Sequence, residues 1–174
     1  MNDLIGEVAL NADQIKSGVQ AVSKTLNKLY VNKDVVIISV VPGGMFFTAD
    51  LVRDLNFDLS MDYISCIHTP GDRHNSSPIV YHKNIEIKNK HVILIDDAIE
   101  SGGTMKRLVE FFQNNHSIAS IAIATLFVKP NRANIEVPQY YAYELETDEI
   151  LVGYGLPWEG KYRNIPFVSK ILLK

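Results

Sequence analysis

Apolar runs with little polar interruption recur along the chain and predict strands that are buried on both faces. The clearest run covers residues 35–41, where a single Ser stands among Val and Ile. Such runs are typical of strands in a parallel sheet covered by helices, whereas a half-exposed strand alternates apolar and polar residues. Four further strands are expected, at residues 63–67, at 92–95, within 118–128 and near 150–152.

A helical period appears between residues 12 and 29, where apolar side chains recur every three or four positions. Asn11 is a suitable N-cap for this helix, because Gln14 follows three positions later and completes a capping box. The apolar positions that carry the period are Ile15, Val19, Val22, Leu26 and Leu29.

Two more helices are expected between the strands, one from Gly44 to about residue 55 and one over residues 104–115. Strands that alternate with helices indicate an α/β fold, in which helices flank a central, mostly parallel sheet. Ligands of such sheets bind beyond the carboxyl ends of the strands. The functional site is therefore expected at that edge of the sheet.

Composition narrows the class of protein. The chain has 174 residues, enough for one domain with a sizeable core. Its net charge of −3 gives no basic excess, so neither a nucleic acid nor a membrane is an expected partner. No apolar run approaches the ~18 residues of a membrane span. The N-terminus resembles no signal peptide, which favours the cytoplasm.

Cys66 is the only cysteine, which excludes an intrachain disulfide and a Cys-rich zinc site. It lies in an apolar stretch and is expected to be a small core residue.

The strongest chemical signal is the segment 92–104, in which a buried strand ends in Asp96 and Asp97. A loop of Ser, Gly, Gly and Thr at 101–104 then opens a helix. Glycine amides, hydroxyl donors and the helix dipole together suit a phosphate. The acids would repel that phosphate, but they can accept hydrogen bonds from sugar hydroxyls. The segment therefore predicts a site for a sugar phosphate.

The segment 92–104 has three other interpretations. A buried strand ending in acids resembles a Walker B strand, but no G-x-x-x-x-G-K-[ST] motif precedes it. It also resembles the first strand of a response-regulator receiver, with Lys129-Pro130 downstream. However, only one helix and one strand fit between Asp97 and Lys129. An acidic turn that merely caps a helix leaves the Ser-Gly-Gly-Thr loop unexplained.

The segment 92–104 resembles the phosphoribosyl-diphosphate signature of type I phosphoribosyltransferases. Residues 41–51 resemble the family's diphosphate loop and the helix after it, and residues 152–167 resemble the C-terminal hood of the hypoxanthine-guanine branch. The resemblance implies the type I phosphoribosyltransferase fold, with residues 1–174 as a single domain. It also implies a small hood built from parts of the N-terminus and of about residues 140–174.

The resemblance implies a purine salvage enzyme, a pentosyltransferase. Such an enzyme converts hypoxanthine or guanine, with 5-phosphoribosyl 1-diphosphate, to the nucleoside 5-monophosphate (IMP or GMP) and diphosphate. Mg²⁺ is the implied cofactor, and a homodimer or homotetramer the implied assembly. Met45, Phe46 and Phe47 are candidate contacts between subunits, with core packing as the alternative.

The resemblance also assigns roles on the phosphoribosyl side. Asp96 and Asp97 hold the ribose hydroxyls, directly or through Mg²⁺. Gly43 and Gly44 offer backbone amides to the diphosphate, with Arg163 as a charged partner whose fork matches phosphate oxygens. The residues that bind the 5-phosphate are Ser101, Gly102, Gly103 and Thr104.

On the purine side, the resemblance makes Lys129 the donor to the 6-oxo group, against the alternative of a solvated lysine at a strand end. Glu100 stands where the family has the acid that takes a ring proton. Ile150 offers apolar contact, and Leu151 offers its backbone to the purine edge. The polar loop 69–78 closes over the site, unless it is an ordinary surface connection.

Five positions depart from the family pattern. Glu100 replaces Asp, and Pro42 replaces a basic residue. Ile150 replaces an aromatic residue, Pro157 replaces a metal-binding Asp, and His68-Thr69 replaces Ser-Tyr. One interpretation is a divergent but active enzyme. The alternative is a catalytically weak regulator of the same fold that senses nucleotide or phosphoribosyl diphosphate. The intact acid pair, phosphate loop and base-side lysine favour the enzyme.

Overall fold

The computed structural model describes residues 4–66 and 75–172 of the chain. Within them, the main sheet has six strands in the order β4-β3-β2-β5-β6-β7. Neighbours from β3 to β7 are parallel, and β4 is antiparallel to β3. The strands are β2 (Val35–Val41), β3 (Leu59–Cys66), β4 (Ile79–Val80), β5 (His91–Ile99), β6 (Ser120–Val128) and β7 (Gln139–Glu144).

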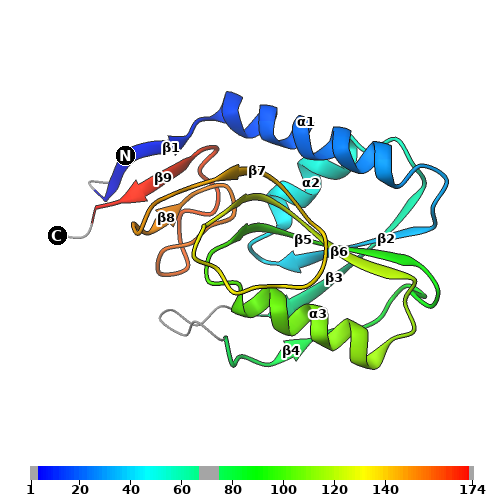
Figure 1. Ribbon diagram of the computed structural model, residues 1–174. Helices are drawn as coiled ribbons and strands as arrows, with labels where there is room; N and C mark the ends of the chain where they lie inside the picture. Colours follow the sequence, from blue (N-terminus) through cyan, green and yellow to red (C-terminus); the bar gives the residue numbers. More distant parts are fainter. Residues whose placement is uncertain (1–3, 67–74, 173–174) are drawn as a thin grey trace.

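Helices cover both faces of this sheet, which confirms the predicted α/β class. Figure 1 shows α1 and α2 on one side of the sheet and α3 on the other. The helices are α1 (Ala12–Leu29), α2 (Met45–Arg53) and α3 (Gly103–Asn115). The predicted capping box of α1 is present, since the Asn11 and Gln14 side chains each accept a hydrogen bond from the other's backbone N–H at 2.9 Å.

The lack of alternation in the strands has a simple cause, because each central strand contributes to two cores. Val35 and Ile37 of β2 pack in the cluster under α1 and α2. Val36 and Ile38 point the other way, into the cluster that α3 completes. Every residue of β2 except the last is buried, so a polar face on this strand would have no solvent to meet.

A second, three-stranded sheet joins the two ends of the chain. Its order is β1-β9-β8 and both pairings are antiparallel. In Figure 1 it lies at one end of the main sheet, beside the ends of β5 and β6. The strands are β1 (Ile5–Leu10), β8 (Leu151–Val152) and β9 (Val168–Ile171).

The strand expected near residues 150–152 therefore exists as β8, but it is not part of the main sheet. The fifth parallel strand is β7, which the sequence pattern did not reveal. Its sequence is Gln-Tyr-Tyr-Ala-Tyr-Glu and its residues are half-buried or exposed, because it lies at the edge of the sheet. An edge strand needs no continuous apolar run, so the pattern that marks the central strands is absent from β7.

Other boundaries differ by a few residues. The strand expected at 63–67 begins earlier, at Leu59, and α2 ends at Arg53 rather than near residue 55. The strand that carries the two acids does not stop before them but continues to Ile99, paired with β6. Cys66 is a buried free cysteine, as expected for a small core residue.

Replacing Leu26 with Ala tests the packing of α1, because the Leu26 side chain is fully buried under this helix. The loss of its methyl groups and the cavity left behind should lower the free energy of unfolding by about 2–5 kcal/mol. Urea denaturation measures this. Leu29→Ala on the same helix is the matched control, since Leu29 is 40 % exposed and should cost much less. Equal losses in both variants would contradict the assignment of the buried face.

Candidate functional site

The two acids lie where β5 extends past its neighbour β2. The parallel register between these strands ends at Ser39 and Ile95, while β5 continues alongside β6 through Asp96 and Ala98. The chain after β2 turns away through Pro42, which follows a cis peptide bond, and enters α2. The turn leaves Asp96 and Asp97 at the carboxyl edge of the sheet, as the sequence predicted.

The loop 42–44 lies directly against the acids, and its glycines are what permit this approach. A Cβ atom on Gly44 would lie 2.6 Å from the Ile95 carbonyl oxygen and 2.7 Å from the Asp96 Cα. A Cβ atom on Gly43 would lie 2.9 Å from a carboxylate oxygen of Asp97. A side chain on Gly44 would meet backbone and force the loop away from the strand, whereas one on Gly43 would displace the carboxylates of the acids.

A third segment, between β8 and β9, closes on the same place. Gly155 has a φ of +107°, which favours glycine, and a Cβ atom there would lie 2.2 Å from the Gly43 carbonyl oxygen. The Arg163 guanidinium donates a hydrogen bond to the Gly155 carbonyl. The Tyr154 hydroxyl donates to a carboxylate oxygen of Asp50 on α2 at 2.6 Å, which ties the segment to the helix after the loop.

Both acids have raised pKa values. Burial is the main cause for each, since it disfavours the charged carboxylate. The pKa of Asp97 rises to about 6. That of Asp96 rises well above its ordinary value, with the charge of Asp97 as the second cause. The positive charge of Arg163 acts in the opposite direction on both. The pair therefore favours a ligand that brings hydroxyl donors or positive charge.

The loop 101–104 opens α3 in the manner expected of an anion site. Gly102 precedes the helix with a left-handed backbone, and the N–H of Gly103, the first residue of α3, donates to the Ser101 hydroxyl at 3.5 Å. The first N–H groups of a helix have no partner within the helix, so they can face an anion. Thr104 is held from the side, because its hydroxyl accepts from the Asn75 amide at 2.7 Å.

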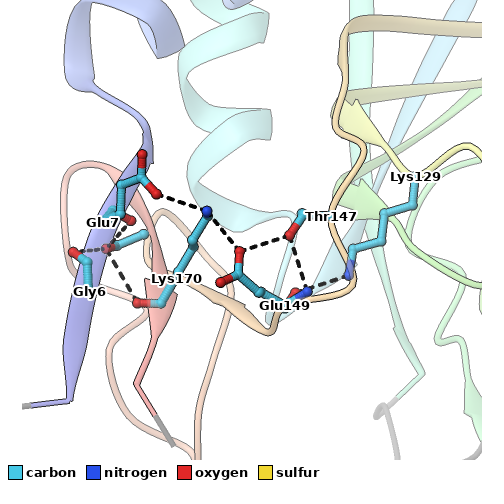
Figure 2. Close-up of polar contacts among 7 residues, drawn as sticks. Gly6, Glu7, Lys129, Thr147, Glu149 and Lys170 are labelled. Atoms are coloured by element: carbon cyan, nitrogen blue, oxygen red, sulfur yellow. Dashed lines mark hydrogen bonds and ion pairs between the residues drawn. The ribbon is translucent and has the colours of Figure 1, made fainter.

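Lys129 follows β6 and reaches across to two acceptors. Its ammonium lies 3.2 Å from a carboxylate oxygen of Glu100 and donates to the Glu149 carbonyl at 3.2 Å. Figure 2 shows the side chain extended toward Glu149. The side chain is only 19 % exposed, which contradicts the alternative of a freely solvated lysine. The two candidate catalytic residues, Glu100 and Lys129, therefore form one ion pair.

A cavity of about 1100 Å³ separates the phosphate-type loop from the connection between β7 and β8. Four predicted site residues line it: Glu100, Ser101, Gly103 and Lys129. The negative charge of Glu100 also raises the pKa of Asp97, so the cavity and the acid pair adjoin. The other lining residues were not predicted, and they are Pro130, Asn131, Ala133, Glu146, Thr147 and Asp148.

The unpredicted wall at 130–133 supports the predicted residues. The Ala133 N–H donates to the Ser101 carbonyl, and the Arg132 guanidinium donates to the Lys129 carbonyl, both at 2.8 Å. The dipeptide Pro130-Asn131 directly after a strand is a turn signal that could have pointed to this wall. Asn75, which is buried against Thr104, carried no such signal.

The residues predicted to contact the purine or a second subunit differ in their burial. The Leu151 side chain is 2 % exposed and packs in the core, while Ile150 beside it is 36 % exposed. Phe47 is buried in the core under α2, so it is not available as a subunit contact, unlike the exposed Met45 and Phe46. His68, Thr69 and most of the loop 69–78 lie outside the described residues.

The described residues contain neither a cluster of metal-binding side chains nor a helix that could span a membrane. Within residues 4–66 and 75–172, no three His, Cys, Asp or Glu side chains cluster so as to hold a metal ion by themselves. No helix in these ranges is long and apolar enough to cross a membrane.

Comparison with known proteins gives a consistent result. Residues 10–159 match the family described as the phosphoribosyl transferase domain. The hypoxanthine-guanine phosphoribosyltransferase of Staphylococcus aureus is 30 % identical over 98 % of this chain and 96 % of its own.

Two solved structures resemble the fold over nearly the whole chain. A hypoxanthine-guanine phosphoribosyltransferase from Bacillus anthracis has a TM-score of 0.87 and 26 % identity, covering 98 % of this chain and 99 % of that one. A hypoxanthine-guanine-xanthine phosphoribosyltransferase has a TM-score of 0.85 and 30 % identity, with the same two shares covered.

The raised pKa of Asp97 predicts a pH dependence of stability. Because this pKa is about 6 in the folded protein and about 4 in an unfolded chain, the folded state keeps protons that the unfolded state releases. The free energy of unfolding of the wild type should therefore fall, relative to Asp97→Asn, as the pH rises from about 4 to about 6. Urea denaturation at a series of pH values, with a chelator present, measures this.

Asp58→Asn is the control, because Asp58 is exposed. Its stability should follow that of the wild type across the same pH range. If Asp97→Asn also runs parallel to the wild type, the carboxyl group of Asp97 is not penalised by burial.

Proposed function

Because the chain belongs to the hypoxanthine-guanine phosphoribosyltransferase family, we propose that it transfers the ribose 5-phosphate group of 5-phosphoribosyl 1-diphosphate to hypoxanthine or guanine. The products are the nucleoside 5-monophosphate and diphosphate, and the role is purine salvage. The observation that carries the proposal is the position of Lys129. Its ammonium is held beside a cavity that the loop opening α3 also lines.

The phosphoribosyl side is assigned to three segments. The loop of Ser101, Gly102, Gly103 and Thr104 binds the 5-phosphate with amides and hydroxyls. Asp96 and Asp97 accept hydrogen bonds from the ribose hydroxyls. Gly43 and Gly44 offer amides to the diphosphate. Their closeness to the acids supports a substrate whose ribose and diphosphate are adjacent.

Arg163 supplies positive charge for the diphosphate on the same side. Its charge already acts on both acids, and the segment that carries it packs against Gly43 through Gly155. A guanidinium suits phosphate oxygens because its donors form a planar fork.

The purine side is assigned to Lys129 and Glu100. A lysine ammonium has three donors, and Glu100 and Glu149 use two of them. The third donates to the 6-oxo group of the purine. Adenine carries an amino group at that position, which is itself a donor, so adenine is disfavoured. Ile150 gives apolar contact, and the Leu151 backbone faces the purine edge.

The reaction is a displacement at the anomeric carbon of the ribose. The bond from this carbon to the diphosphate oxygen breaks, the diphosphate keeps the electron pair, and a ring nitrogen of the purine forms the new bond. Glu100, which is 44 % exposed on its side chain, takes the proton of that nitrogen. The protein contributes mainly by positioning both substrates and by stabilising developing charge.

The described residues fit Mg²⁺ as a cofactor that is shared with the substrate. Mg²⁺ keeps several waters and binds through one or two carboxylates plus substrate phosphates. Asp96 and Asp97 provide such carboxylates, and no third His, Cys, Asp or Glu among the described residues completes a metal cluster with them. When bound, the ion neutralises charge on the diphosphate.

We further propose a homodimer or homotetramer in the cytoplasm, acting on small molecules rather than nucleic acid or membranes. The exposed Met45 and Phe46 support an assembly, since they present apolar surface at the start of α2. The cytoplasm is supported by the single cysteine, which is free and buried.

A purified-protein assay tests the proposed function. Phosphoribosyl diphosphate and Mg²⁺ are incubated separately with hypoxanthine, guanine, xanthine and adenine, and nucleotide formation is followed. Turnover is expected with hypoxanthine or guanine and not with adenine. No turnover with any base, together with measurable binding of phosphoribosyl diphosphate, would instead indicate the regulator.

Lys129→Ala tests the purine-side assignment. Loss of a hydrogen bond from a charged donor costs about 1.5–3 kcal/mol, so kcat/KM for hypoxanthine should fall roughly 10- to 100-fold. Steady-state kinetics against both substrates measure this. Lys83→Ala, which removes a surface lysine paired with Glu86, should leave both values unchanged. Full activity in Lys129→Ala would show that another residue recognises the 6-oxo group.

A further inference from the structure

Lys170 on β9 joins three parts of the chain that lie far apart in sequence. Its ammonium lies 2.9 Å from a carboxylate oxygen of Glu7 on β1 and 2.8 Å from one of Glu149. Glu149 belongs to the connection between β7 and β8, which lines the cavity through Thr147 and Asp148. Figure 2 shows the two contacts and the path from Lys170 through Glu149 to Lys129.

Glu149 is held at its side chain, its amide and its carbonyl. Its carboxylate accepts from Lys170 and from the Thr147 hydroxyl, the latter at 3.2 Å. Its N–H donates to the Thr147 hydroxyl at 3.1 Å. Its carbonyl accepts from Lys129. Of these four contacts, the ion pair with Lys170 is the one that reaches a strand of the small sheet.

The strand that carries Lys170 also holds the neighbouring backbone. The Ile171 N–H donates to the Ile150 carbonyl at 2.9 Å, one residue after Glu149. Two adjacent residues of β9 therefore hold two adjacent residues that follow the cavity-lining Thr147 and Asp148, one through the backbone and one through an ion pair. The hydrogen bond from Lys170 lowers the pKa of Glu149, so both groups are charged near neutral pH.

Because the Glu149 carboxylate is charged, the direction in which this side chain points affects the nearby Lys129 ammonium. The Glu149 backbone already lies within 3.2 Å of the Lys129 ammonium, so a carboxylate released from Lys170 would have Lys129 as a nearby cation. The Lys129 side chain is 19 % exposed and that of Glu149 is 54 % exposed, so their attraction is that of a partly screened surface pair. A released Glu149 would then compete with the purine oxygen for the third donor of Lys129.

We propose that Lys170 is a positioning residue for purine recognition, which keeps the Glu149 carboxylate away from the Lys129 ammonium and so leaves that ammonium available to the 6-oxo group. This inference rests on the proposed function. In this role, Lys170 itself contacts no substrate. It acts on the purine and not on the phosphoribosyl diphosphate, because Lys129 lies on the purine side.

Steady-state kinetics of Lys170→Met test the proposal. The KM for hypoxanthine should rise roughly twofold to fivefold, the scale of an exposed ion pair, while the KM for phosphoribosyl diphosphate stays unchanged. Lys170→Arg should retain the wild-type values, because its guanidinium can still hold both carboxylates. Lys90→Met is the matched control, since Lys90 pairs with Asp34 at 3.3 Å and is 23 % exposed, against 27 % for Lys170.

The double variant Lys170→Met/Glu149→Gln separates this role from a merely structural one. A neutral amide side chain at position 149 would not attract Lys129, so the double variant should recover most of the lost purine affinity. A purely structural role predicts that the second substitution adds to the damage. Additive loss, or equal changes in both KM values, would overturn the proposal.

A readout without turnover keeps the two proposals apart. NMR of isotope-labelled lysine side chains, with Lys129 assigned from Lys129→Ala, should show the Lys129 signal shifted in Lys170→Met and restored in the double variant. An unshifted signal would overturn the positioning role. If the wild type forms no nucleotide but the signal shifts as expected, the proposed function fails while the positioning of Lys129 by Lys170 stands.

Discussion

Two carboxyl groups lie side by side near the end of β5, and the free energy that their burial costs constrains the rest of the site. Both have raised pKa values, chiefly because water is excluded from them. Arg163 offsets part of this cost by its charge. The loop 42–44 and Gly155 approach so closely that a side chain on Gly44 or Gly155 would meet backbone. The acid pair thus stabilises hydroxyl donors and cations, which phosphoribosyl diphosphate with Mg²⁺ would bring under the proposed function.

The proposed purine half of the site depends on a second electrostatic arrangement, in which one ammonium is shared among acceptors. Lys129 lies between Glu100 and the Glu149 carbonyl, and both distances are 3.2 Å. Glu100 is one methylene longer than the family's usual Asp, and in this chain its carboxylate reaches Lys129. Under the proposal, the small sheet β1-β9-β8 acts on this half through Lys170. Glu100 and Lys129, the two partners of the ion pair, directly follow β5 and β6 of the main sheet.

Of the other departures, Pro42 belongs to the loop against the acids and Pro157 to the segment between β8 and β9, while His68 and Thr69 lie outside the described residues. Pro42 is exposed and Pro157 is half-buried, and neither side chain carries a charge. The basic residue expected at position 42 is absent, and the positive charge of Arg163 acts on both acids. Ile150 is exposed beside the cavity wall and can contact a purine without stacking on it.

The residues alone were enough for the class of fold, the limits of α1 and β2, and the acid pair followed by a phosphate-type loop. Each of these depends on local patterns: uninterrupted apolar runs, helical spacing with a capping box, and a turn of small residues at a helix start. The edge strand β7, the wall at 130–133 and the path from Lys170 to Lys129 depended on the tertiary structure. They depend on contacts between residues that are distant in sequence. Glu7 and Glu149, for example, both contact Lys170, and this depends on how the two sheets are placed and not on any local period.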